Sequence, residues 1–171
     1  MKKVLIAVDG MNGSSDSVLS VFQNLVKPPE NIVLVHVKQL EGNSLMLDML
    51  SDSEIATMKE SMKGTEHMEK LDMRAQKILA YHKKKLEEGG LVCIKTVVRE
   101  GRPTDEILKV AEEEGVDLII VGCSGKTKMQ KMITGCASKD VERNAKVPVL
   151  VAKGNGCGEH EKIWREAYAT Q

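Results

Sequence analysis

The stretch Val116-Asp-Leu-Ile-Ile-Val-Gly-Cys-Ser-Gly125 contains the pattern that decides the fold of this chain. Its run Leu118–Val121 is apolar and rich in branched side chains, which is typical of a buried strand, and glycines follow it directly. Before it, Pro103 is suited to begin a helix and Gly115 is suited to end that helix. A helix, a buried strand and a glycine-rich turn in this order indicate a parallel α/β sheet.

Four further apolar runs have the same character, and amphipathic segments separate them. Right-handed crossovers between such runs produce a parallel sheet with helices on both faces. The sequence therefore predicts an open, doubly wound five-stranded parallel sheet of the Rossmann-like α/β class. The expected strands are Lys3–Val8, Asn31–Val37, Leu91–Val98, Leu118–Val121 and Val147–Ala152.

Two expected helices lie between the first three strands. The first is capped by Ser14 and Ser15 and ends at Pro28 and Pro29. The second precedes the third strand, and we expect its single apolar stripe to face the core. The alternative is an adaptable methionine-rich surface for a partner protein in residues 45–73. The stripe consists of Met68, Leu71, Ala75, Ile78, Leu79, His82 and Leu86.

Two chemically distinctive residues receive structural interpretations. His82 lies on the apolar stripe with no Cys or acidic partner at metal-ligand spacing, so we expect a packing residue whose polar atoms are satisfied. Cys93 falls in the third expected strand, and we expect it to be buried, as free cysteines usually are.

Composition excludes several classes of protein. The length of 171 residues is that of one domain, and 25 basic residues balance 25 acidic ones, so no chain-wide field favours nucleic acid or an anionic membrane. The first apolar run, Val4–Val8, is too short for a signal peptide or a membrane span, which predicts a cytoplasmic protein with reduced cysteines. Aromatic residues make up only 2% of the chain, so the core must be built from aliphatic side chains and Met.

Residues 122–138 form a glycine-rich segment between the fourth expected strand and the last helix. Ligands of doubly wound sheets bind beyond the carboxyl ends of the strands, which is where this segment begins. Close-approaching backbone amides, a helix N-terminus and the lysines at 126, 128 and 131 together favour a phosphorylated ligand. The alternative is that the glycines serve only in turns. A Walker A loop is excluded, because the position five residues before Gly125 is Ile120.

The glycine spacing resembles the signature of ATP-binding universal stress proteins. Gly122 and Gly125 enclose two residues, and Gly125 and Gly135 enclose nine. The similarity continues through VLIAVDG, IVLVHV, VVREGRPTDEIL, AEEEGVDLIIVG and VPVLVAK. It covers roughly residues 1–153 and leaves residues 154–171 as a C-terminal extension, whose Trp164 and Tyr168 we expect to dock on the domain or on a partner subunit.

The resemblance implies a role for each matching residue. Asp9 would hold the nucleoside, and the backbone of Val37 would contact adenine. The signature departs from the family at Cys136, which stands where a Ser or Thr is expected; the loss of one neutral hydrogen bond costs about 1 kcal/mol, or several-fold in affinity. The implied ribose and phosphate contacts are Gly122, Gly125, Lys126, Gly135, Cys136, Ala137 and Ser138.

The resemblance further implies ATP as the ligand, with Mg or Mn as candidate accompanying cations, and a homodimer paired through the last strand, residues 147–152. A nucleotide-dependent stress sensor or regulator with an unidentified regulatory partner fits best, without nucleic acid or membrane. Catalysis has little support, because only Asp9 and Asp140 are distant candidates for a catalytic carboxylate. Two alternatives stay open: an interaction module of the same fold that binds no nucleotide, and an ATP-hydrolysing enzyme.

Overall fold

The computed structural model describes residues 2–9, 18, 21, 28–38, 51, 53–54, 57, 60–61, 64–122 and 137–152. Within these residues five parallel strands form one sheet in the order β3-β2-β1-β4-β5. The predicted parallel α/β sheet is therefore confirmed. The strands are β1 (Lys3–Ala7), β2 (Asn31–Lys38), β3 (Ile94–Glu100), β4 (Leu118–Gly122) and β5 (Val149–Ala152).

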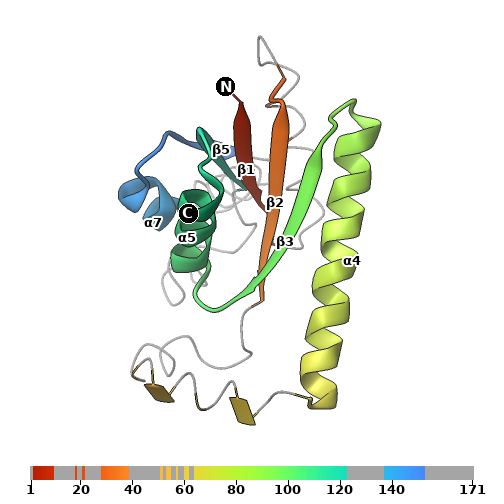
Figure 1. Cartoon of the computed structure of the whole chain (residues 1–171), viewed down its shortest axis with the longest axis vertical. Coiled ribbons are helices and arrows are strands. Elements are labelled where there is room, and N and C mark those ends of the chain that lie inside the picture. The colour runs from red at the N-terminus through yellow and green to blue at the C-terminus, as the bar shows by residue number, and fades with distance from the viewer. Residues whose placement is uncertain are drawn as a thin grey trace, which may run out of the picture.

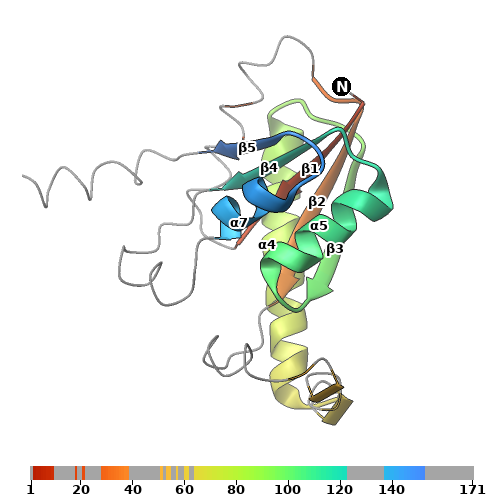
Figure 2. The same ribbon diagram turned by 90° about the vertical axis from the view of Figure 1, so that its left-hand side faces the viewer.

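Helices cover both faces of the sheet. Helix α4 (Glu66–Glu88) lies on one face, and helices α5 (Pro103–Glu114) and α7 (Ala137–Asn144) lie on the other (Figure 1). A view turned by 90° shows the sheet between these two layers (Figure 2). Among the described helices, none combines the length and the apolar character that a bilayer span requires.

The sequence signals at the helix ends act as expected. Helix α5 begins at Pro103 and ends before Gly115, which adopts the left-handed conformation at φ 57° while its N–H donates to carbonyls of the last turn. Thr65 caps α4 by accepting a hydrogen bond from the Met68 amide. The helix expected after Ser14 lies outside the described residues, apart from Val18 and Val21, which are helical.

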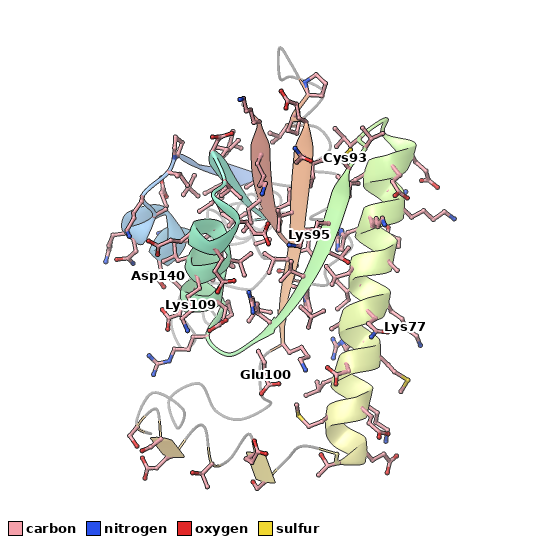
Figure 3. All side chains as sticks on the ribbon, viewed as in Figure 1. Lys77, Cys93, Lys95, Glu100, Lys109 and Asp140 are labelled. Carbon is pink, nitrogen blue, oxygen red and sulfur yellow. The ribbon has the colours of Figure 1, made fainter. Side chains whose placement is uncertain are left out.

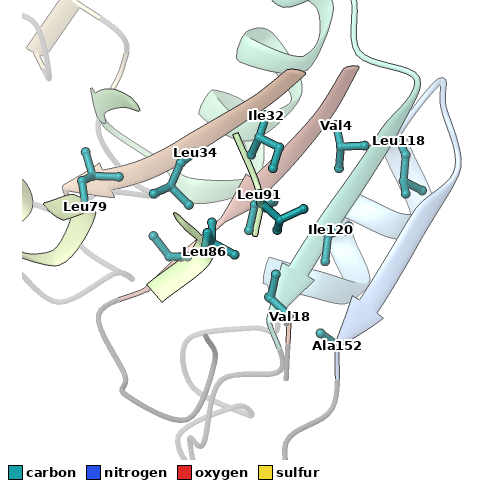
Figure 4. Packing of buried hydrophobic residues seen from close by; sticks show 12 residues of the cluster. Val4, Val18, Ile32, Leu34, Leu79, Leu86, Leu91, Leu118, Ile120 and Ala152 are labelled. Carbon is teal, nitrogen blue, oxygen red and sulfur yellow. The ribbon is translucent and has the colours of Figure 1, made fainter. Parts of the chain in front are cut away.

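Two apolar cores fill the space between the layers. The first packs α4 against the sheet through Leu79 and Leu86 (Figure 4). Five of the seven residues of the predicted α4 stripe are buried, which confirms that this stripe faces the core. The second packs α5 and α7 against the opposite face. Successive side chains of β2 point alternately into the two cores: Ile32 and Leu34 lie in the first core, and Val33 and Val35 lie in the second. The buried members of the first core are Val4, Ile6, Val8, Val18, Ile32, Leu34, Leu79, Leu86, Leu91, Leu118, Ile120 and Ala152.

The connection between α4 and β3 differs from the prediction. Leu91 is buried in the first core and its N–H donates to the Leu86 carbonyl, which holds residues 91–93 outside the regular strand. The strand begins at Ile94 rather than at Leu91. Cys93 is exposed and has a φ of 57° (Figure 3), so the prediction of a buried strand cysteine was wrong.

Three consecutive glutamates end helix α5, and each has a cationic partner from outside that helix. Carboxylates are unfavourable at a helix C-terminus because they face the negative end of its dipole. Here the partners come from β1, from β3 and from the segment before β5. The pairs are Glu112 with Lys146 at 2.8 Å, Glu113 with Arg99, and Glu114 with Lys95 at 2.5 Å and with Lys3 at 3.4 Å.

Candidate functional site

The strand order reverses between β1 and β4. From β1 the chain continues to β2 and β3 on one side, whereas β4 and β5 lie on the other side. Val18, which follows β1, lies in the core on the α4 face, whereas α7, which follows β4, packs on the opposite face. The chain therefore leaves β1 and β4 towards opposite faces of the sheet. A crevice for a ligand is expected at this position in a sheet of this kind.

Asp9 and Gly122 lie at this switch point. Ala7 of β1 pairs with Val121 of β4, so the residues that follow each of them are brought side by side at the edge of the sheet. Asp9 is exposed, and Gly122 is half-buried. The absence of a side chain on Gly122 leaves its backbone open to close approach next to the Asp9 carboxylate. Asp9 and Gly122, both predicted from the sequence as ligand contacts, therefore lie at the same edge of the sheet.

Val37 lies one strand away, at the carboxyl end of β2. It is half-buried and pairs with Arg99 of β3. Its neighbour Lys38 forms ion pairs with Asp72 of α4 and, at 3.3 Å, with Glu100 of β3. Burial alone would lower the pKa of Lys38, but the hydrogen bonds to the two carboxylates outweigh burial and raise the pKa above its ordinary value. These two ion pairs link the end of β2 to α4 and to β3. Sequence spacing did not predict them.

Helix α7 begins on the side of the sheet where β4 and β5 end (Figure 2). Ala137 is exposed at the first position of the helix, and Ser138 is buried at 7% exposure. A helix N-terminus carries unpaired amides and partial positive charge, which suit an anion. The other predicted contacts, Gly125, Lys126, Gly135 and Cys136, lie outside the described residues, as do Lys128 and Lys131.

Two histidines lie beneath this edge, in the layer between α4 and the sheet. Nδ1 of His36 lies 2.8 Å from the Val8 carbonyl oxygen, and since that oxygen only accepts, Nδ1 carries the proton and donates it. His82 of α4 is 2% exposed, and its Nδ1 has no hydrogen-bond partner among the described residues. The prediction that His82 is buried is confirmed, but the prediction that its polar atoms are satisfied was wrong.

The pKa of His82 reflects this position. Burial lowers it below the ordinary imidazole value; the Asp9 carboxylate raises it in part and His36 lowers it further. The spacing of His36 and His82 in the sequence did not reveal that the two imidazoles lie close enough to interact electrostatically. The available signal was the period-two alternation in β2, which places His36 on the face of Ile32 and Leu34, towards α4.

The described residues include no group of three or more His, Cys, Asp or Glu side chains arranged to hold a metal ion. Asp9, His36 and His82 thus form an electrostatic cluster and not a set of metal ligands.

Comparison with known proteins supports the relationship that the motifs indicate. The model of the universal stress protein family matches residues 1–153. The universal stress protein MJ0577 of Methanocaldococcus jannaschii is 29% identical over 157 residues, covering 89% of this chain and 94% of its own. The universal stress protein YxiE of Bacillus subtilis is 28% identical over 151 residues, with 88% of this chain and 98% of its own covered.

Solved structures agree with this relationship. The structure of MJ0577 superposes with a TM-score of 0.64 at 30% identity, covering 89% of this chain and 95% of that chain. A universal stress protein in complex with cAMP superposes with a TM-score of 0.58 at 17% identity, covering 90% and 98%, which is a likeness of fold. The family match over most of the chain, together with the parallel sheet and the switch point described above, shows that this chain belongs to the universal stress protein family.

Proposed function

We propose that the protein binds ATP at the β1–β4 switch point and acts as a nucleotide-dependent regulator in the cytoplasm. The observation that carries this proposal is the pairing of Ala7 with Val121, which brings Asp9 and Gly122 together at the carboxyl edge of the sheet. This edge is where doubly wound sheets bind their ligands.

The residues at this edge fit the parts of an adenine nucleotide. The Asp9 carboxylate is suited to accept hydrogen bonds from ribose hydroxyls, and main-chain groups at Val37 are suited to read the edge of a base. Gly122 would let backbone approach the sugar and phosphates closely. Amides at Ala137 and Ser138, at the start of α7, would receive phosphate oxygens together with the glycine-rich segment that precedes them.

Two neighbours of similar fold support adenine nucleotides as the ligand class. One is described as a universal stress protein in complex with cAMP, the other as an Archaeoglobus fulgidus universal stress protein in complex with dAMP. At 17% identity each, they show only that this fold accommodates such ligands. The choice of ATP for this chain rests on the resemblance of its glycine spacing to the ATP-binding members of the family, with Mg or Mn as the accompanying cation; the lysines add only a preference for a phosphorylated ligand.

Calorimetric titration of the full-length protein with ATP, with and without Mg or Mn, tests the proposal. We expect binding by the parent protein and at least about tenfold weaker binding by Gly122→Val, because a branched side chain would occupy the approach to the sugar and phosphates; tenfold is about 1.4 kcal/mol. Gly89→Val is the matched control, since Gly89 is exposed at the far end of α4 with an ordinary φ of −76°.

Lack of affinity for any adenine nucleotide in the parent protein would overturn the proposal and favour an interaction module that binds no nucleotide. Phosphate release that disappears in Asp9→Ala would instead move the function to an ATP-hydrolysing enzyme.

We also propose a homodimer that pairs through residues 147–152. Strand β5 lies at the edge of the sheet, with β4 as its described neighbour. A partner strand would cover the open hydrogen-bonding groups of this edge. Residues 1–153 would then form the nucleotide-binding and dimerising domain, and residues 154–171 an extension beyond it.

A further inference from the structure

Two histidines, the buried His82 and the half-buried His36, lie beneath the proposed nucleotide site. Nδ1 of His36 donates a hydrogen bond to the carbonyl oxygen of Val8, which is the residue before Asp9. Val8 itself is buried in the core on the α4 side of the sheet. His82 faces the same core from α4, between the buried residues Leu79 and Leu86. One imidazole thus holds the residue before Asp9, and the other lies in the same core on α4, where the Asp9 carboxylate acts on it electrostatically.

His82 is in an unusual position for a polar group. An imidazole nitrogen that is buried without a partner loses its hydrogen bonds to water and gains none in return. Apolar residues of equal size would fill the same place at lower cost. The energetic cost of this histidine at the inner side of the candidate site points to a role beyond packing.

Few charged groups face His82 from the packed elements. Strand β2 contributes His36, and the end of β1 contributes Asp9. The charge of Lys38, at the end of β2, is balanced by its ion pairs with Asp72 and Glu100. Among the described residues, Asp9 is the carboxylate that stabilises a protonated His82, and His36 opposes protonation.

We propose that His82 is a positioning residue of the nucleotide site that acts through Asp9: a neutral imidazole leaves the Asp9 carboxylate to the nucleoside, and a protonated imidazole draws that carboxylate towards α4, so ATP affinity falls on acidification. This inference rests on the proposed nucleotide binding. It makes the site sensitive to proton concentration through a residue that does not itself contact the ligand.

The direction follows from the surroundings of His82. Because burial lowers the pKa of His82, the imidazole is neutral near pH 7 and gains its proton only below the ordinary imidazole value of about 6.5. Once charged, it is attracted by the Asp9 carboxylate, while the neighbouring His36 opposes the charge. The bound nucleoside and the proton therefore compete for one carboxylate.

The experiment is calorimetric titration of ATP into the full-length protein at pH 7.5, 6.5 and 5.5. The parent protein is compared with His82→Leu and His82→Gln, which do not titrate in this range. Met68→Leu is the matched control, because Met68 is buried on the same stripe of α4 and the substitution removes no titratable group. The phosphates of ATP titrate equally in every sample, so the comparison is the ratio of parent to variant affinity.

We expect the parent and Met68→Leu to lose about tenfold more affinity between pH 7.5 and 5.5 than the two His82 variants; a tenfold effect corresponds to one unit of proton linkage. By reciprocity, the midpoint of the His82 imidazole titration, followed by NMR in the parent protein, must fall on saturation with ATP by the logarithm of the same factor. The NMR titration also decides the question if both His82 variants fail to fold.

The outcomes separate the two proposals. ATP binding with the same pH dependence in the parent and the His82 variants, or an NMR midpoint that ATP does not move, overturns the role of His82 while leaving nucleotide binding intact. Absence of ATP binding by the parent at pH 7.5 overturns the proposed function and this inference together.

Discussion

Cys93 combines a reactive side chain with a backbone conformation that disfavours any side chain. Its φ of 57° lies in the left-handed region, where a Cβ crowds the following carbonyl oxygen at a cost of about 1–2 kcal/mol. Contacts of the preceding residues and of the Cys93 carbonyl group together fix this backbone conformation. Leu91 is anchored in the core, and the Cys93 carbonyl accepts a hydrogen bond from the Ile32 amide at 3.0 Å. The residue is thus fixed by its neighbours and not by its own contacts.

Substitution of Cys93 by glycine is therefore expected to leave stability unchanged or to raise it by up to about 1 kcal/mol, because the relief of strain exceeds the added freedom of the unfolded chain. Urea unfolding followed by circular dichroism measures the effect. Thr96→Gly, at an exposed position within β3, is the control and should destabilise by about 0.5–1 kcal/mol. Equal losses in the two variants would contradict the interpretation of strain.

At the scale of elements, helix α5 shows how a locally unfavourable sequence becomes favourable in the fold. Glu112, Glu113 and Glu114 oppose the helix dipole, and an isolated helix of this sequence would be weakened by them. Lysines and an arginine from other elements neutralise all three. Close by, Asp117 accepts hydrogen bonds from the amides of Lys2 and Lys3 at 2.6 and 2.9 Å, which ties the start of β1 to β4.

Through these carboxylates, the free energy of unfolding depends on pH. Hydrogen bonds from Lys146 and Lys95 lower the pKa of Glu112 and Glu114, and backbone amides lower the pKa of Asp117. A lowered native pKa means that the unfolded chain binds more protons, so this stabilisation is complete above about pH 4.5 and is lost as the pH falls through the native values. We expect the urea midpoint to fall steeply between about pH 4.5 and pH 3.

Glu114→Gln tests the assignment to these pairs. The variant should be less stable than the parent at pH 7, and the difference should shrink towards pH 3, where the parent has lost the same charge. Glu88→Gln, with an exposed carboxylate at the end of α4, should keep the acid dependence of the parent. A Glu114→Gln curve parallel to that of the parent would exclude this ion pair as a source of the acid dependence.

Features that follow from the local sequence pattern could be predicted, whereas features that depend on tertiary contacts could not. The strands and the α4 stripe follow from local periodicity, which the tertiary structure then uses without changing it. The Asp9–Gly122 edge was predictable because every parallel strand ends at the same side. The exposure of Cys93, and the lack of a partner for His82 Nδ1 within the described part of the chain, could not be predicted, because both depend on where Leu91 and β2 lie relative to α4. Burial tendency alone gives the wrong answer for Cys93.

At the scale of the whole molecule, the two sheet edges differ. Strand β3 has several exposed side chains, including Lys95 and Thr96, whereas the residues of β5 are apolar and half-buried or buried. Charged and polar residues discourage pairing at an edge, and an apolar edge favours it. In the parallel ladder, the Ile119 amide donates to the Pro148 carbonyl, so the N–H and C=O of Val149 point away from β4. This pattern supports β5 as the edge available to a second subunit.

Val149→Pro is expected to convert a homodimer into a monomer, because it removes an outward N–H while leaving the β4 ladder intact. Analytical ultracentrifugation over a range of concentrations measures the shift. Val149→Ala retains the N–H and serves as the control, which should remain dimeric apart from a modest loss of affinity. A dimeric Val149→Pro protein would mean that subunits associate through another surface.

The central position of β1 also governs the order in which the domain is completed during synthesis. The first strand made needs β2 on one side and β4 on the other, and β4 begins only at Leu118. At about 5–20 residues per second, the ribosome separates these two partners by several seconds. During that interval one edge of β1 and the faces of the early strands lack their final cover, and such surfaces favour association with other chains. A protein of this topology therefore benefits from chaperone protection before its middle strand is enclosed.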